Sequence, residues 1–150
     1  MRKETAEGDL RLPYTGAKQN SVLVVSGSER SRETLAEVFA SSRYAPVTTR
    51  GSAAEARRLV LDTPFSLVFI NTPLPDETGS QLALDLSNSR NCCVALLVPG
   101  DSFDLVNEQV EDAGVLTLSK PCTAQQLRQA AAMMSATRFK LADLEQKTAT

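Results

Sequence analysis

Few residues of this sequence could perform covalent chemistry, and the base that such chemistry needs is absent. Histidine is missing altogether, which removes the commonest general base and the commonest nitrogen ligand of zinc. The candidate nucleophiles are Ser26, Cys93 and Cys122, but none of them lies in a G-x-S-x-G, P-loop or metal-ligand motif. We therefore expect no catalytic residue, no metal site and no cofactor. A small enzyme that uses one of these nucleophiles is the weakest alternative.

The cysteines themselves point to packing. There are three of them, an odd number, and Cys92 and Cys93 are adjacent within an apolar run. This arrangement is typical of buried free thiols and not of a disulfide framework.

A second group of candidate residues follows the apolar runs of the sequence. Ser26 and Gly27 come after the first run, Asn71 comes after another, Val98 ends a third, and Lys120 follows the last. In a parallel sheet the carboxyl ends of the strands lie at one edge, where α/β proteins place their ligand sites. These five residues therefore form the candidate site.

Alternating strands and helices must position that site. The apolar, β-favouring runs at 21–25, 45–49, 66–70, 92–98 and 115–118 predict five strands. Helical spacing follows each of them, with Ser52 and Glu55 as a capping box and Gly114 as the C-cap of a helix over 101–113. Because parallel neighbours need crossover helices, we expect an α/β fold with a five-stranded parallel sheet in a three-layer sandwich.

The last helix differs from the others in length. Thr123 and Gln126 form a capping box at its start. A seven-residue repeat of apolar or small residues follows, at Leu127, Met134 and Leu141 and at Ala130, Thr137 and Leu144. The repeat predicts the start of a coiled coil, with Met134, Thr137, Leu141 and Leu144 as dimer and linker residues. Alternatively, Met133 and Met134 pack on the sheet and the end of the helix is a solvated tail.

The organisation of the chain and its charge narrow the function. We expect a flexible extension at 1–20, one folded domain at 21–135 and a coiled-coil linker at 136–150. No apolar run approaches the roughly 18 residues that cross a bilayer, and the N-terminus has no signal-peptide core, so we expect a cytoplasmic protein without membrane contact. The net charge of −2 argues against binding of a nucleic-acid backbone by this segment.

The order of these parts resembles the receiver domain of two-component response regulators, over about residues 21–134. The matching residues are the run VLVV before Ser26, the run LVFI before Asn71, Leu74-Pro75, Gly79 and Lys120-Pro121. The resemblance implies the flavodoxin-like (βα)5 fold, with a cis peptide bond before Pro121.

The residues that do chemistry in receiver domains are replaced. The resemblance places the phospho-accepting aspartate at Asn71, two acidic residues at Ser26 and Gly27, and a hydroxyl at Val98, so that only Lys120 matches. A neutral amide cannot form the acyl phosphate, and this residue set should hold Mg²⁺ poorly. The resemblance is therefore to a degenerate pseudo-receiver. Asp76 and Glu29 are the nearest acids, but both are displaced from the strand ends.

Three segments narrow the resemblance to the receiver domains of ANTAR-type transcription antiterminators, namely 24–29, 114–121 and 137–145. In that family the last helix continues as a coiled coil into an RNA-binding domain. The resemblance implies a homodimer, and it implies RNA binding only through a domain outside this chain.

These observations lead us to expect a phosphorylation-independent signalling and dimerisation module that regulates transcription by antitermination. Its partner would be a protein or a small ligand that carries the signal. The main alternative is a ligand-sensing module, in which the neutral pocket at the strand ends holds a small molecule.

Overall fold

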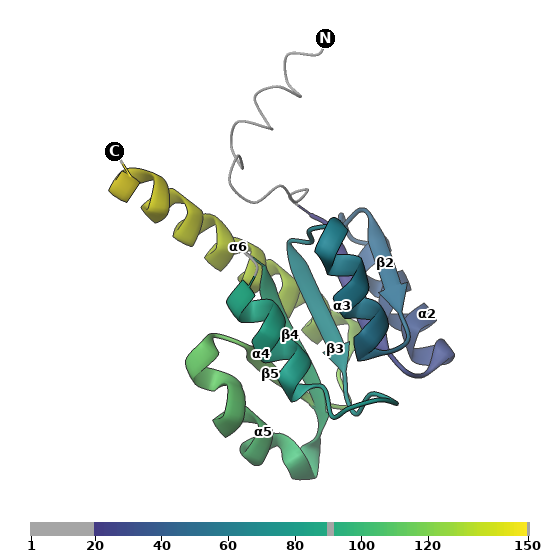
Figure 1. Cartoon of the computed structure of the whole chain (residues 1–150). Helices are drawn as coiled ribbons and strands as arrows, with labels where there is room; N and C mark the ends of the chain where they lie inside the picture. Colours follow the sequence, from purple (N-terminus) through teal and green to yellow (C-terminus); the bar gives the residue numbers. More distant parts are fainter. Residues whose placement is uncertain (1–19, 90–91, 150) are drawn as a thin grey trace.

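The computed structural model describes the backbone of residues 20–89 and 92–149, with side chains over 20–88 and 92–137. Five parallel strands form one sheet in the order β2-β1-β3-β4-β5 (Figure 1). The strands are β1 (Val22–Ser26), β2 (Val47–Arg50), β3 (Leu67–Asn71), β4 (Cys93–Pro99) and β5 (Leu116–Lys120). The helices are α2 (Glu29–Ala40), α3 (Ala53–Asp62), α4 (Ser80–Ser89), α5 (Phe103–Val110) and α6 (Ala124–Ala149). The predicted α/β fold is confirmed.

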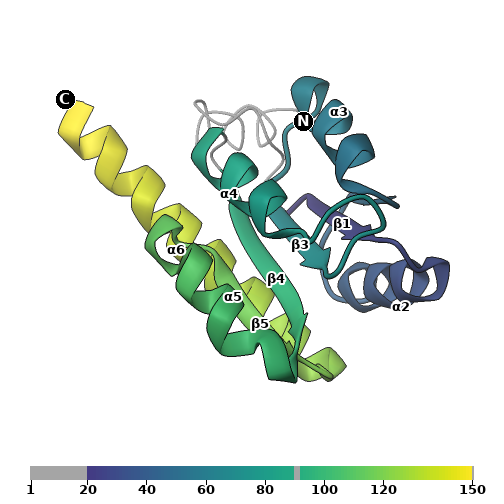
Figure 2. The same cartoon turned by 60° about the horizontal axis from the view of Figure 1, so that its bottom comes forward.

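Helices cover both faces of the sheet because its central strands are apolar on both sides. Alternate residues of β1 and β3 belong to two separate clusters of buried side chains. One cluster packs against α3, α4 and α5, and the other against α2 and α6. The result is the expected three-layer sandwich, seen from a second side in Figure 2.

The register of the sheet fixes which residues meet at its carboxyl edge. Ser26 at the end of β1 lies opposite Asn71 at the end of β3. Asn71 in turn lies opposite Leu97 of β4, and Pro99 lies opposite Lys120 of β5. The candidate residues at the strand ends are thus brought to one edge, as the parallel topology requires.

The predicted helix over 101–113 is wrong in part, because it is three consecutive pieces. The 3₁₀ turns η1 (Gly100–Ser102) and η2 (Glu111–Ala113) flank the short helix α5. Gly114 ends this region with φ of +80°, in the left-handed conformation that glycine adopts without strain, so the predicted C-cap is confirmed. Leu105, an apolar residue of this helix, is 63% exposed.

The capping predictions hold with one change. Thr123 and Gln126 cap each other reciprocally, with a Thr123 N to Gln126 Oε1 distance of 2.9 Å and a Gln126 N to Thr123 Oγ1 distance of 3.1 Å. The Ser52 hydroxyl accepts from the Glu55 amide at 3.2 Å, whereas the Glu55 carboxylate accepts from the amide of Gly51 and not from that of Ser52.

Helix α6 is 26 residues long, and only its first half covers the sheet (Figure 1). Its second half extends away from the domain, as the sequence predicts. Over the described residues, no helix combines the length and the apolar character that a membrane crossing requires. The predicted N-terminal extension lies outside the described residues except for Asn20, and the division into domains stays a prediction.

Candidate functional site

Three of the five predicted site residues form a hydrogen-bonded chain at the carboxyl edge of the sheet. The Lys120 ammonium donates to Asn71 Oδ1 at 2.9 Å, and Asn71 Nδ2 donates to Ser26 Oγ at 3.0 Å. We call this the Ser26–Asn71–Lys120 relay. The Asn71 amide thus accepts from Lys120 through its oxygen and donates to Ser26 through its nitrogen, without carrying a charge.

The relay also has contacts to the backbone around it. Lys120 Nζ donates to the carbonyl oxygen of Thr72 at 2.6 Å, and the amide of Ser28 donates to Ser26 Oγ at 3.4 Å. Burial of the ammonium lowers the pKa of Lys120, and the nearby Cys122 thiol opposes this in part. A lysine that faced an ionised carboxylate would have its pKa raised, so the direction of this shift reflects the neutral surroundings of the relay. The Lys120–Pro121 peptide bond is cis, as the resemblance implied.

Gly27 is a position at which the resemblance leads us to expect an acidic side chain, and Pro75 occupies the space next to it. A Cβ atom at Gly27 would lie 2.7 Å from Cδ of Pro75, a proline in the loop between β3 and α4. Real Cβ atoms do not approach other atoms this closely, and a pyrrolidine ring has little freedom to move aside. The acidic group is therefore absent from the sequence and excluded by the packing of this loop.

Val98 is not brought to the relay. Its side chain is 1% exposed and packs in the cluster beneath α3, α4 and α5. Because it directly follows Leu97, the register partner of Asn71, it points to the opposite face of the sheet from Asn71. The hydroxyl that lies near the relay is that of Thr72, which donates to the carbonyl oxygen of Leu97 at 2.9 Å.

Arg32 is a residue at this edge that the sequence analysis did not identify. Its Nη1 donates to the carbonyl oxygen of Ser26 at 2.7 Å from the first half of α2. The only sequence signal is a cation within the first turns of the helix that follows β1. Such a position is common on solvated helix faces, so it carries little information by itself.

Of the two nearby acids, Asp76 has structural partners and Glu29 is exposed. Asp76 accepts from the amides of Ala53 and Ala54, both at 3.0 Å, and thereby caps α3. These two backbone hydrogen bonds lower the pKa of Asp76. Glu29 begins α2 and is exposed. Among the described residues, no group of three or more His, Cys, Asp or Glu side chains could hold a metal ion.

A cluster of ion pairs joins the loop after β3 to helices α3 and α4. Arg57 of α3 contacts Glu77 at 2.6 Å and Asp85 of α4 at 2.8 Å. The hydrogen bond from Arg57 lowers the pKa of Asp85, and Gln81 adds to this effect. We call Arg57, Asp76, Glu77 and Asp85 the acidic clasp.

The predicted dimer residues fall into two groups, because Met134 packs on the sheet and the others come after it along α6. Met134 is 6% exposed and packs on the sheet with Leu127 and Ala130, so this part of the repeat serves the core. This corrects the prediction for Met134 as a linker residue. Thr137 is exposed, and its Oγ1 donates to the carbonyl oxygen of Met133 at 3.0 Å. The side chains of Leu141 and Leu144 lie outside the described residues, and their role stays a prediction.

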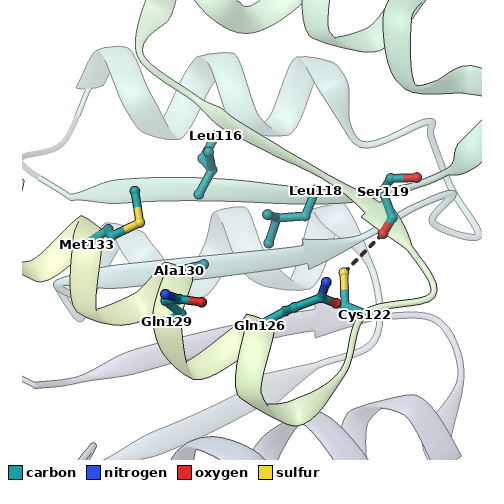
Figure 3. Close-up of a pocket in the computed structure, with 8 residues that line it drawn as sticks. All are labelled: Leu116, Leu118, Ser119, Cys122, Gln126, Gln129, Ala130 and Met133. Carbon is teal, nitrogen blue, oxygen red and sulfur yellow. Dashed lines mark hydrogen bonds between the residues drawn. The ribbon is translucent and has the colours of Figure 1, made fainter.

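A largely apolar groove of about 350 Å³ runs between β5 and α6 (Figure 3). Leu116 and Leu118 line it from the strand, and Met133, 60% exposed, lines it from the helix. Cys122 closes one end, with its Sγ 3.2 Å from the carbonyl oxygen of Ser119.

Burial raises the pKa of the Cys122 thiol. None of the three cysteines, all of them described, forms a disulfide, as expected, but all three are half-buried, so the expected burial is wrong.

No protein-family model matches this chain, and no curated protein is significantly similar to it in sequence. Solved structures do match its fold. A CheY-like response regulator receiver domain from Methanospirillum hungatei JF-1 has a TM-score of 0.74 and 17% identity, over 81% of this chain and 97% of that chain. An adenylate cyclase from Rhodopirellula baltica gives a TM-score of 0.75 at 20% identity, over 86% and 96%.

A third match is the beryllofluoride-activated NtrC4 receiver domain dimer, with a TM-score of 0.71 and 18% identity over 79% of this chain and 98% of that chain. The chain thus has the fold of CheY-like receiver domains, the (βα)5 sandwich that the sequence predicts. At these identities the likeness concerns the fold alone.

Proposed function

We propose that this chain is a receiver-type signalling module that works without phosphorylation and is not an enzyme. The observation that carries the proposal is the Ser26–Asn71–Lys120 relay, in which two neutral side chains and one ammonium are joined by hydrogen bonds and no carboxylate takes part. Phosphoryl capture by a receiver fold needs a carboxylate nucleophile and an anionic cage for Mg²⁺. Asn71 supplies no nucleophile, and Pro75 fills the space of one cage residue.

The test is exposure of the purified chain to acetyl phosphate and Mg²⁺, followed by intact mass spectrometry. We expect no added phosphoryl group, while a receiver domain with a complete acidic site, run in parallel, gains one. The Asn71→Asp variant is the matched control, because it restores the nucleophile without the cage, and we expect it to stay unmodified as well. A stable phosphoryl adduct on the unaltered chain would overturn the proposal.

Two further observations support the non-enzymatic assignment. The raised pKa of Cys122 keeps its thiol protonated at neutral pH, which is the wrong direction for a nucleophile. The Ser26 side chain is fully buried and accepts hydrogen bonds from Asn71 and Ser28. A thiol probe that labelled one cysteine far faster than the others at pH 7 would contradict the assignment.

The signal is proposed to leave the domain through α6 as a homodimeric coiled coil. The seven-residue repeat covers the sheet as far as Met134 and continues along the projecting half of the helix. The dimeric NtrC4 receiver domain shows that this fold accommodates self-association in another protein. The ANTAR-like segment 137–145 supports an RNA-binding output domain beyond this chain and a role in transcription antitermination.

Light scattering on the whole chain tests the dimer. The double variant Leu141→Glu/Leu144→Glu places charges on the proposed seam and should shift the chain towards the monomer. The matched control is Gln125→Glu, which adds charge at an exposed position of the first turn and should leave the mass unchanged. A monomer at high protein concentration for the unaltered chain would contradict the coiled coil.

A further inference from the structure

A second hollow, of about 340 Å³, is lined by residues of β2 and α3. Strand β2 lies at the opposite edge of the sheet from β5, which lines the apolar groove (Figure 1). The lining residues of the hollow are Arg50, Glu55, Arg58 and Leu59. The lining is mostly polar, in contrast to the groove between β5 and α6. No residue of the relay and no residue of the acidic clasp belongs to it.

The guanidinium groups here lack carboxylate partners. Both ion pairs found among the described residues belong to Arg57, so Arg50 and Arg58 form none there. Arg50 Nη1 donates to the carbonyl oxygen of Thr49 at 2.7 Å, which positions the group and leaves its other N–H donors available. Glu55, the single acid of the lining, accepts from the amide of Gly51 at 3.1 Å.

A third guanidinium group, that of Arg32, lies outside the lining of the hollow but close to Glu55. A Cβ atom at Gly51 would lie 3.1 Å from Arg32 Nη1 and 3.8 Å from Glu55 Oε1, so these two side chains flank Gly51. The side chains of Arg32, Arg50, Arg58 and Glu55 together carry a net charge of +2, although the chain as a whole has a net charge of −2. Like charges that gather without partners destabilise a fold unless an anion offsets them.

The helix start contributes little to this charge. The first amides of α3, those of Ala53 and Ala54, are occupied by the carboxylate of Asp76. A ligand in the hollow would therefore be held by side chains. Guanidinium groups present planar pairs of N–H donors that match the oxygens of a phosphate, and a phosphate dianion balances two positive charges.

We propose that this hollow is a binding site for a small phosphorylated ligand, held through its phosphate group by Arg50 and Arg58, with Arg32 close to Glu55 of its lining. Arg32 connects this region to the end of β1, because its Nη1 donates to the Ser26 carbonyl oxygen at 2.7 Å. A phosphate that attracts Arg32 competes with this contact. Ligand binding would thus act on the end of β1 without covalent modification of the chain.

The test is an NMR titration of the ¹⁵N-labelled chain with inorganic phosphate, at ionic strength held constant with chloride. We expect saturable shifts of the Gly51 and Glu55 amides. Arg58→Gln removes an exposed side chain that has no hydrogen bond in the described structure, and it should weaken binding at least about threefold, as expected for one exposed ion pair. The matched control Arg128→Gln removes the same charge from the exposed face of α6 and should leave the affinity unchanged.

Glu55→Gln should change the affinity for phosphate in the opposite direction. The amide oxygen can still accept from Gly51, while the repulsion between the carboxylate and phosphate is removed, so binding should tighten by about twofold or more. Non-saturating shifts that chloride reproduces would overturn the proposal. So would equal affinities for the unaltered chain, Arg58→Gln and Glu55→Gln.

Discussion

At the end of β3, Asn71 is a neutral residue joined to Ser26 and Lys120, whereas a few residues along the chain Asp76 and Glu77 keep their charges. The difference lies in the partners that the fold provides. Asp76 meets two backbone amides of α3, and Glu77 meets the guanidinium group of Arg57. At the relay, by contrast, the single ammonium of Lys120 is satisfied by an amide oxygen and a carbonyl oxygen.

The comparison shows where this chain provides partners for carboxylates. Buried or crowded acids are costly unless a cation or several donors offset them. The acidic clasp has such partners within the chain, while an acidic cage at the strand ends would need a metal ion. In this chain the first region carries acids, and the second carries side chains that pair with one another.

The largest expected effect comes from restoring a side chain at Gly27. Gly27→Ala places a Cβ atom 2.7 Å from Pro75 Cδ, so one of the two must move. We expect a loss of about 1–3 kcal/mol in the free energy of unfolding, measured by urea denaturation, because overpacking costs this much. Pro75→Ala in the same chain should restore part of the loss. An unchanged stability for Gly27→Ala would show that the loop yields easily and that the cage position is open.

The next effect concerns the cation of the relay. Lys120→Met removes the donors to Asn71 Oδ1 and to the Thr72 carbonyl oxygen. Hydrogen bonds to a charged, half-buried donor lead us to expect a loss of about 1–2 kcal/mol on urea unfolding. Arg128→Met removes a positive charge from an exposed position of α6 and serves as the control, with an effect of less than about 0.5 kcal/mol. Equal losses in the two variants would mean that the relay contributes nothing to stability.

A smaller, pH-dependent effect is expected in the clasp. The pKa of Asp76 is lowered in the folded chain, so its contribution to stability is complete above the ordinary aspartate pKa of about 3.9. That contribution is lost as the pH falls through the lowered folded-state pKa. Asp76→Asn should lower the urea midpoint at pH 7, and the gap from the unaltered chain should close on acidification. Asp112→Asn, which removes a carboxylate from an exposed position in η2, is the control and should leave the urea midpoint at pH 7 unchanged.

The smallest effect distinguishes a buried hydroxyl without a partner from one that has a partner. Thr117 Oγ1 is buried and has no hydrogen-bond partner in the described structure, whereas Thr72 Oγ1 donates to the Leu97 carbonyl oxygen. Thr117→Val should raise the free energy of unfolding by up to about 1 kcal/mol, because it removes an unsatisfied polar atom. Thr72→Val should lower it. A loss of stability in both variants would contradict this view of Thr117.

The sequence predicts the fold well because the alternation of strands and helices and the burial of the strands follow from local patterns. Five apolar runs and the helix signals between them are sufficient for the parallel sandwich, and the strand bounds differ by one or two residues. The region over 101–113 was less predictable, since 3₁₀ turns and an α-helix share similar local signals. The exposure of Leu105 follows from the orientation of α5, which apolar spacing alone did not determine.

The sequence predicts the site residues only where their position after an apolar run identifies them. Asn71, Ser26 and Lys120 are recognised from their positions after apolar runs, and the structure brings them together. Two contacts could not be predicted, because they join segments far apart in the chain and depend on the geometry of the loop after β3. They are the contact of Pro75 with Gly27 and the capping of α3 by Asp76. Arg32 carries no local signal, and Val98 was assigned to the site although its side chain points to the opposite face.

The length of α6 gives it mechanical leverage. An α-helix rises about 1.5 Å per residue, so the part beyond Thr137 extends about 18 Å past the domain as a stiff rod. A tilt of about 10° at its base would displace its far end by about 3 Å, an amount that can disrupt or create a helix contact. Slight shifts of side chains where α6 leaves the sheet are thereby amplified at the far end of the helix.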